Sequence, residues 1–211
     1  MQKIGIFPLG IVLFPQSLYP LHIFEERYKE LVNHCLSSGE VMGINLVSNS
    51  KMYEIGCTAS VADVFKKYED GKLDITIEGL KRYRLLNFID GEKSYFMGEI
   101  EYIEEEDDFM DYQKLMDCVE VYNVIVEQIQ GFHLDKIKLS NVNTKMPSYL
   151  LAQKAGLTPS QKQVLLEINS ENKRLDYMYQ HLRKITPVIH QADQVNKIIR
   201  NDGYLKPDNI R

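Results

Sequence analysis

The sequence predicts an α+β fold, in which a β-rich part over residues 1–105 precedes an all-helical part over residues 109–200. Short apolar segments with the period of a strand, separated by glycine-containing turns, fill residues 41–103. A run of acidic residues, Glu104 to Asp108, follows the last of these segments. Beyond it apolar residues recur with the period of a helix, so we place the boundary between the two parts at this acidic run.

The composition narrows the functional classes. A chain of 211 residues with 44% hydrophobic content can bury a large core. Its net charge of -5 argues against nucleic acid as a partner. Three isolated cysteines suit a reducing compartment and buried positions rather than disulfides or a zinc site. No apolar run approaches the ~20 residues of a membrane helix, so we expect a cytoplasmic protein without a membrane partner.

The first elements are predicted from prolines and a change of period. A short buried strand is expected at Ile11–Phe14, and a second extended segment at Leu18–Ile23. Helical spacing then begins at Glu25, whose charge suits a helix N-terminus, and Gly39 offers a C-terminal stop. Pro8 interrupts the apolar N-terminal run, which argues against a signal peptide.

The middle of the chain predicts a closed or nearly closed sheet. Asp70-Gly71 and Asp90-Gly91 are hairpin turn signals, and Gly79 is expected to break a strand pattern. The expected strands are Val41–Val47, Ile55–Phe65, Leu73–Glu78, Lys81–Phe88 and Tyr95–Ile103.

The remainder predicts several helices and a polar tail. The first runs from Phe109 to Gly131, and an irregular connection with apolar Leu134, Ile137 and Leu139 covers residues 132–146. Two further helices start at Pro147 and, with Thr158 as N-cap, at Pro159, and the second should bury Val164, Leu165 and Ile168. In the last helical pattern, from Leu175 to Ile199, Pro187 either kinks the helix or starts another, and residues 201–211 form the tail.

One long string, FPLGIVLFPQSLYPLHIFEERY at residues 7–28, resembles the opening of the Lon N-terminal domain family. The segments IGCTASV, DGKLDITIEGLKRYR, YFMGEIEYIEEE and QKQVLLEINSENKRLDYMYQHL are similar to later parts of that family. The resemblance implies a PUA-like β pseudo-barrel with one packed helix, followed by a helical subdomain. Its motif residues, which we interpret as structural, are Phe7, Pro8, Phe14, Pro15, Pro20, Leu21, His22, Ile23, Phe24, Glu25, Arg27, Tyr28, Gly79 and Arg82.

The same resemblance implies a function in polypeptide recognition. In that family the domain engages apolar substrate segments for an ATP-dependent protease. The sequence contains neither a phosphate-binding glycine loop nor a serine–lysine protease domain, nor a catalytic motif of another class. We therefore expect a non-catalytic module without a cofactor, whose partners are unfolded or specific polypeptides and a separate protease or ATPase.

The ionisable residues of the motif have structural interpretations. His22 is expected to hydrogen-bond the turn before the helix, and Glu25 with Arg27 to form caps or ion pairs that fix the helix. The other histidines, at positions 34, 133, 181 and 190, show no metal-ligand spacing. A hydrolase of another class stays a minor hypothesis, because sequence cannot show a cleft with perturbed ionisable groups.

An RNA-binding face is the alternative hypothesis. Basic residues interleave with Tyr68 and Tyr83 in a pattern that can stack bases, although solvated strand faces produce the same pattern. The basic residues of this face are Lys66, Lys67, Lys81, Arg82 and Arg84.

Overall fold

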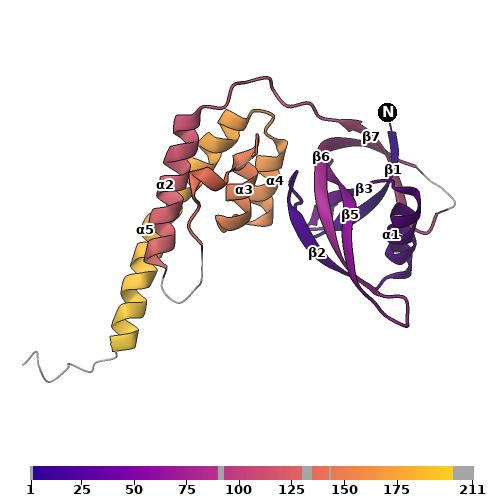
Figure 1. Cartoon of the computed structure of the whole chain (residues 1–211), viewed down its shortest axis with the longest axis horizontal. Coiled ribbons are helices and arrows are strands. Elements are labelled where there is room, and N and C mark those ends of the chain that lie inside the picture. Colours follow the sequence, from indigo (N-terminus) through magenta and orange to yellow (C-terminus); the bar gives the residue numbers. More distant parts are fainter. Residues whose placement is uncertain (1, 90–92, 130–134, 143, 202–211) are drawn as a thin grey trace, which may run out of the picture. The chain divides into compact units, whose positions relative to one another are not determined.

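The structure of the protein is a computed structural model (Figure 1) that describes residues 2–89, 93–129, 135–142 and 144–201, with side chains up to residue 189. Its contacts divide the chain into two compact units. The first contains Met1–Asp107 and Ala152–Ser170, and the second contains Asp108–Leu151 and Glu171–Arg211. Outside the described residues lie the predicted turn at 90–91, the predicted helix end at 131, His133, Leu134 and the tail from 202, as does the side chain of His190.

The first unit is built on a closed β-barrel, as expected. Its strands follow the order β1 (Gln2–Leu9), β7 (Phe96–Tyr102), β6 (Leu73–Ile89), β5 (Ile55–Lys67) and β3 (Met42–Ser48). A parallel pairing between β1 and β3 closes the ring, whereas the other pairings are antiparallel. Two short strands lie off this ring, because β2 (Leu18–Ile23) pairs with β6 and β4 (Lys51–Met52) pairs with β3. The α+β class is thereby confirmed.

The predicted strand at Ile11–Phe14 is wrong. The first strand lies earlier, and Pro8 belongs to it, because the pairing of β1 with β7 ends at Ile6 and fewer ladder bonds need a donor near Pro8. Val12 to Phe14 are buried without strand pairing. Ser17 Oγ holds this turn by donating to the Phe14 carbonyl at 2.6 Å and accepting from the Phe14 amide at 3.1 Å.

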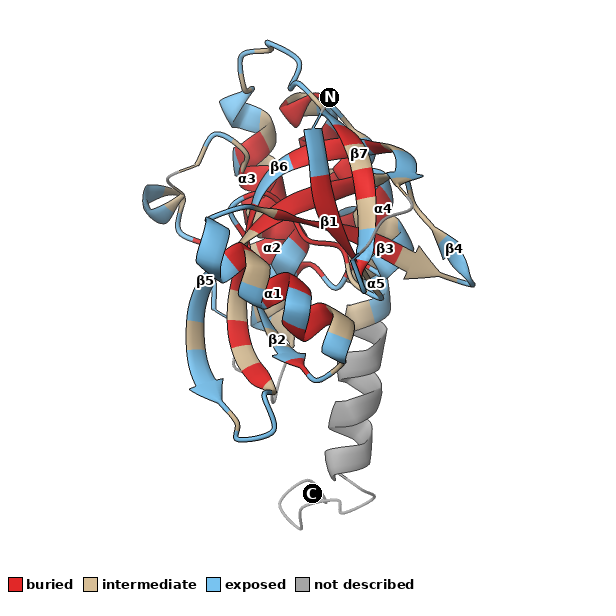
Figure 2. Ribbon diagram, turned by 90° about the vertical axis from the view of Figure 1, so that its right-hand side faces the viewer, coloured by how far each residue is buried: buried red, intermediate tan, exposed pale blue. Residues whose placement is uncertain are grey.

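Helix α1 (Glu26–Ser38) covers one side of the barrel, and its residues are buried on one side and exposed on the other (Figure 2). Leu31 and Val32 of α1 pack into a core with Ile75 and Ile77 of β6. The helix ends as predicted at Gly39, whose φ of 74° suits a residue without a Cβ.

Gly79 does not break a strand, which corrects the prediction. Strand β6 runs through it, and the missing side chain instead makes room for the loop that precedes β2. A Cβ at Gly79 would lie 2.9 Å from the carbonyl carbon of Phe14 and closer still to its oxygen. Gln16, with φ of 62°, donates its amide to the Gly79 carbonyl, and the Gly79 amide donates to Ser17. This pattern is a β-bulge at the start of β2.

The turn at Asp70-Gly71 is confirmed. Gly71 has φ of 80°, and the Tyr68 amide donates to the Lys72 carbonyl at 2.9 Å to close the hairpin between β5 and β6. Leu73, Ile75 and Ile77 are buried and their alternate neighbours are not, so this half of β6 has one core face and one outer face.

The second unit is helical. Helix α2 (Tyr112–Gln128) starts at Asp111, whose side chain accepts from the amides of Gln113 and Lys114. A short 3-10 helix, η1 (Leu139–Asn141), follows, and α3 (Pro147–Lys154) begins at the predicted proline. Helix α5 (Glu171–Asn201) continues through Pro187 without a second start.

Helix α4 (Pro159–Glu167) groups with the barrel unit, whereas the sequence assigned it to the helical part. Its predicted capping box between Thr158 and Gln161 is present. Leu165 is buried as expected, but Val164 is exposed and Gln163 takes the buried position. Gln163 Nε2 explains the exchange, because it donates to the Ile55 carbonyl of β5 at 3.0 Å.

The cysteines are buried, as predicted. Burial raises the pKa of Cys35 to about 11, and those of Cys57 and Cys118 to about 12. Raised pKa values suppress the reactive thiolate, so these side chains act as small apolar core residues.

Candidate functional site

The candidate site is centred on the motif segment, residues His22 to Tyr28, which connects β2 to α1. His22 does not bond the turn as expected. Its Nδ1 lies 2.6 Å from Oδ1 of Asp74, the residue opposite it on β6. The hydroxyl of Tyr68 donates to the other oxygen of Asp74 at 2.8 Å. These two bonds lower the pKa of Asp74, so its carboxylate stays charged and holds both rings.

An aromatic strip lies around this carboxylate. The rings of His22 and Phe24 stack with centroids 6.0 Å apart, and His22 meets Tyr68 edge-on at 5.8 Å. The ammonium of Lys66 lies 4.3 Å from the centroid of Tyr68. Phe24 is 58% exposed, although it belongs to a strip whose other rings are fixed by hydrogen bonds. The strip therefore presents an apolar ring to solvent in a defined orientation.

A second set of aromatic rings adjoins the other end of the motif segment. Glu25 binds Arg27 through one oxygen, which accepts from Nε at 3.0 Å and from Nη2 at 2.7 Å. The guanidinium then lies 4.8 Å from the ring centroid of Tyr28 and 5.9 Å from that of Phe96. Glu25 therefore forms the predicted ion pair and makes no side-chain cap.

Phe96 and Phe88 extend this second set onto the barrel surface. Their ring centroids are 5.9 Å apart, and about half of each side chain is exposed. Beneath them Tyr28 stacks on Phe7 at 4.0 Å, and both of these rings are buried. The motif segment thus joins a buried aromatic stack to exposed rings on both of its sides.

Strand β2 adds further exposed apolar side chains. Leu18 is 63% exposed and Tyr19 is 37% exposed, whereas Ile23 at the other end is buried. Among the described residues β2 pairs with β6 alone, so its other edge carries no strand. We define the motif surface as the exposed apolar residues Leu18, Tyr19, Phe24, Phe88 and Phe96.

The remaining motif residues lie where a structural role needs them. Phe14 and Ile23 are buried in the first unit, and Gly79 accommodates the Phe14 carbonyl. Pro15 is buried, and Leu21 is partly buried against the core. Pro20 is exposed on β2, in the same strand as Leu18.

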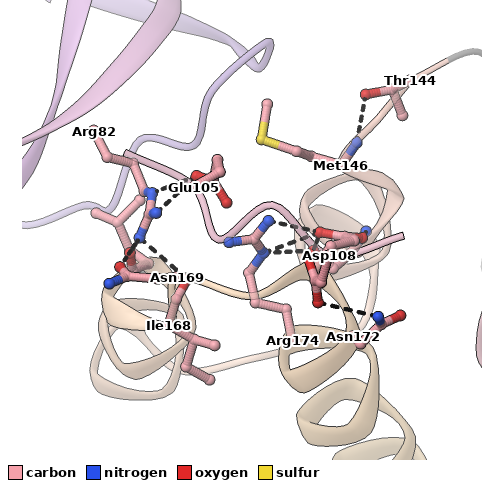
Figure 3. A network of polar contacts seen from close by, with 12 residues as sticks. Arg82, Glu105, Asp108, Thr144, Met146, Ile168, Asn169, Asn172 and Arg174 are labelled. Atoms are coloured by element: carbon pink, nitrogen blue, oxygen red, sulfur yellow. Dashed lines mark hydrogen bonds and ion pairs between the residues drawn. The ribbon is translucent and has the colours of Figure 1, made fainter. Parts of the chain in front are cut away.

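Arg82 is buried, with 2% of its surface exposed, and is therefore not part of an exposed basic face as the alternative assumed. Its Nε and Nη2 lie 2.8 and 2.7 Å from Oε1 of Glu105 (Figure 3). Its Nη1 donates to the carbonyls of Leu166 and Ile168 at 2.9 and 3.1 Å, and to Oδ1 of Asn169. The guanidinium thus fastens the segment after α4 and the acidic run to the barrel.

The other cations of the proposed RNA face do not gather. Lys66 and Lys67 pair with the start of β6, at Asp74 and Leu73. Arg84 lies ten residues further along the same strand, which is roughly 33 Å at the usual rise. The intervening Lys81 faces the Tyr102 ring, so nothing in the described residues supports the RNA alternative.

The described residues contain neither a metal-binding cluster nor a helix that could span a membrane. Among them no cluster of three or more His, Cys, Asp or Glu side chains could hold a metal ion. None of the described helices has the length and apolar character to cross a bilayer. His34 pairs with Glu40 at 3.0 Å and His181 is buried in α5.

Sequence reasoning missed Leu18, Phe88 and Phe96 as surface residues. It also missed the partnership of Asp74 with His22, because these residues are 52 positions apart. A signal was present in the alternation of β6, because Asp74 stands between Leu73 and Ile75 in a strand whose apolar residues alternate with polar ones. The exposure of Phe88 and Phe96 left no such signal, because a large aromatic residue in a strand usually indicates core.

Comparison with known proteins agrees with this fold. Residues 3–184 match the family described as the ATP-dependent protease La (LON) substrate-binding domain. The chain is 23% identical over 214 residues to a Lon protease of Dictyoglomus thermophilum, covering 95% of the chain and 27% of that protein. It is 21% identical over 215 residues to Lon protease 1 of Hydrogenovibrio crunogenus, covering 94% of the chain and 26% of that protein. The chain spans about a quarter of the length of these relatives.

Two solved structures share the architecture. The Lon N-terminal domain protein from Xanthomonas campestris superposes with a TM-score of 0.63 at 22% identity, covering 83% of this chain and 96% of that one. The N-terminal domain of a Mycobacterium avium complex Lon protease superposes with a TM-score of 0.66 at 16% identity, covering 86% and 98%. With a family match over nearly the whole chain, the protein belongs to the Lon substrate-binding domain family.

Proposed function

We propose that this chain is a non-catalytic module that binds exposed apolar segments of polypeptides through the motif surface. The observation that carries the proposal is the set of exposed aromatic rings beside the motif segment, held in place by the His22–Asp74 and Glu25–Arg27 pairs. Family membership supports the same function, since the family is described as a substrate-binding domain.

The physical basis is the free energy of removing apolar surface from water. Burying a Phe side chain that was exposed contributes about 1.5–3 kcal/mol, which corresponds to about 10- to 100-fold in affinity. Phe24 and Phe96 are already oriented by their neighbours, so these side chains lose less conformational entropy when a client binds than mobile rings would. Folded proteins bury the segments that such a surface would bind, whereas unfolded chains expose them.

We further propose that the bound polypeptide is passed to an ATP-dependent protease. The relatives of this chain are Lon proteases, and the matched region is their substrate-binding part. Recognition and proteolysis would then be separate activities, and the residues of the motif surface would take no part in bond cleavage.

Binding to a permanently unfolded protein, such as a reduced and carboxymethylated one, tests the proposal. The wild-type chain should bind this probe and should not bind its folded form. Phe24→Ser should weaken binding about tenfold or more, because an exposed ring of the surface is lost. Phe109→Ser is the matched control, because Phe109 is fully exposed in the second unit and lies outside the motif surface. Equal effects of the two substitutions, or no preference for the unfolded probe, would refute the proposal.

A further inference from the structure

The free edge of β2 has a defined set of hydrogen-bonding groups. The amide of Gly79 donates to the Ser17 carbonyl, so the pair formed by these residues is hydrogen-bonded. Bonded and non-bonded pairs alternate in an antiparallel ladder, and therefore Tyr19, Leu21 and Ile23 bond β6. The backbone groups of Leu18, Pro20 and His22 point away from β6, toward the edge that carries no strand. This placement also explains why β6 loses no bond at Pro20, which has no N–H.

Strands β2, β6 and β5 lie side by side in that order, so β2 and β5 form the two edges of this part of the sheet. The two edges differ in the features that prevent a further strand from pairing. Beyond its pairing with β3, which ends at Ala59, β5 pairs only with β6 among the described residues. This part of β5 has register shifts at Val61/Asp63 and Val64/Lys66, and it ends in two lysines. Bulges and lysines are devices that prevent a further strand from pairing. In β2 the register with β6 is continuous from Leu18 to Ile23, after the bulge at Gln16 and Ser17, and Pro20 is the one residue of this stretch that cannot donate an amide.

The charges beside this edge are mainly negative. The outer face of β6 carries Asp74 and Glu78, which lie directly opposite His22 and Leu18 of β2. The same face of β5, which lies beyond β6 and about 10 Å from β2, carries Asp63 and Lys66. Three carboxylates and one ammonium leave a net negative charge, which attracts a positively charged strand.

We propose that β2 binds one extended segment of a client polypeptide, in which apolar and basic residues alternate, as an additional strand of the sheet. Leu18 and His22 would donate their amides to the client, and the carbonyls of Leu18, Pro20 and His22 would accept from it. Apolar side chains of the client would contact Tyr19 on the core-facing side of the sheet, and its basic side chains would lie near Glu78 and Asp74 on the outer face. The inference rests on the proposed function, since it specifies how the motif surface recognises a polypeptide.

Hydrogen exchange of the full chain tests the binding mode. The probe is a capped heptapeptide of alternating valine and lysine. At saturating peptide, exchange of the Leu18 and His22 amides should slow at least tenfold, while amides of Phe65 to Lys67 on the other edge keep their rates. Binding of the unfolded probe protein without protection of Leu18 and His22 would overturn the strand-addition inference alone. Absence of binding by both the heptapeptide and the unfolded probe would overturn the inference and the proposed function together.

The peptide can be altered to separate strand addition from side-chain contact. N-methyl groups on two neighbouring central amides block both edges of the peptide, and they should weaken binding about tenfold or more. The matched control carries its two N-methyl groups on the terminal residues, and it should bind as the parent does. A valine–glutamate peptide should bind more weakly than the lysine peptide at low salt, with a difference that narrows as salt rises. Equal affinities for the two methylated peptides would contradict the inference.

The protein offers a gain-of-function variant. Pro20→Ala supplies the one donor that the edge lacks, so peptide affinity should rise about two- to tenfold. The same variant exposes a complete edge, and its oligomeric state is therefore measured by sedimentation. Protection of Leu18 and His22 that appears without peptide and grows with protein concentration would assign the edge to a second copy of the chain instead of a client.

Discussion

Arg82 provides a sharp test of how the first unit is held together. Arg82→Met replaces the guanidinium with an apolar side chain of similar length, and Arg84→Met makes the same change two residues away. Arg82 is buried and donates to Glu105, Leu166, Ile168 and Asn169, whereas Arg84 is half exposed and its nearest partner, Glu54, is 3.4 Å away. The two variants therefore differ in burial and bonding but not in chemistry.

The expected cost at Arg82 follows from the acceptors that it leaves behind. The carbonyl of Leu166 loses a buried donor and that of Ile168 a partly buried one. A buried acceptor without a partner costs about 1–3 kcal/mol. Glu105 adds less, because its side chain is 37% exposed and water can replace the guanidinium. We expect a loss of about 2–4 kcal/mol for Arg82→Met, and under about 0.5 kcal/mol for Arg84→Met.

Urea unfolding followed by circular dichroism measures this difference. With a dependence on urea of about 2 kcal/mol per molar, in the middle of the usual range, the midpoint for Arg82→Met should fall by about 1–2 M. Amides near residues 166–169 should also exchange faster in that variant, because their segment is released from the barrel. A midpoint within about 0.3 M of that of Arg84→Met would refute the assigned role of the guanidinium.

Three further predictions concern packing, capping and pH. Gly79→Ala should destabilise the chain by about 1–3 kcal/mol in urea unfolding through collision with the Phe14 carbonyl, whereas Gly10→Ala, with open space around it, should not. Thr158→Ala should cost about 1 kcal/mol through loss of the capping box, and Ser160→Ala, in the same helix turn, should cost less. Burial raises the pKa of Cys57 from 9.0 to about 12 in the folded chain. Between about pH 9 and pH 12 the thiol therefore ionises in the unfolded chain but not in the folded one, and the free energy of unfolding falls as pH rises through this range. Cys57→Ala should flatten this decline in urea midpoints, and thiol reagents should modify native Cys57 at pH 8 far more slowly than the unfolded chain.

Local signals in the sequence were enough to predict the turns and caps. The hairpin at Asp70-Gly71 needs a residue that accepts positive φ, and Gly71 supplies it. The capping box at Thr158 and the helix stop at Gly39 likewise depend on residues within four positions of each other. Such features are readable because the groups that bond are neighbours in the chain.

Long-range contacts explain what the sequence did not predict. Gly79 was expected to end a strand. Instead, its missing side chain leaves room for the carbonyl of Phe14, which lies 65 positions earlier in the chain. Arg82 was placed on a basic surface because its neighbours alternate with tyrosines, although bonds to residues more than 80 positions away bury it. No local pattern distinguishes a buried arginine with several hydrogen bonds from an exposed one.

The motif segment shows why a family signature and a binding surface can share residues. Packing requires Ile23 and Tyr28 to be buried, and the alternation of strand and helix then turns Phe24 and Arg27 outward. Burial of Phe24 would have needed another element to cover the connection between β2 and α1. Instead, the His22–Asp74 and Glu25–Arg27 pairs orient the rings of Phe24 and Phe96, which stay exposed to solvent. Contact of an aromatic ring with water is unfavourable, so this exposure costs free energy. An extended polypeptide bound along the open edge of β2, as proposed above, would cover these rings and remove that cost.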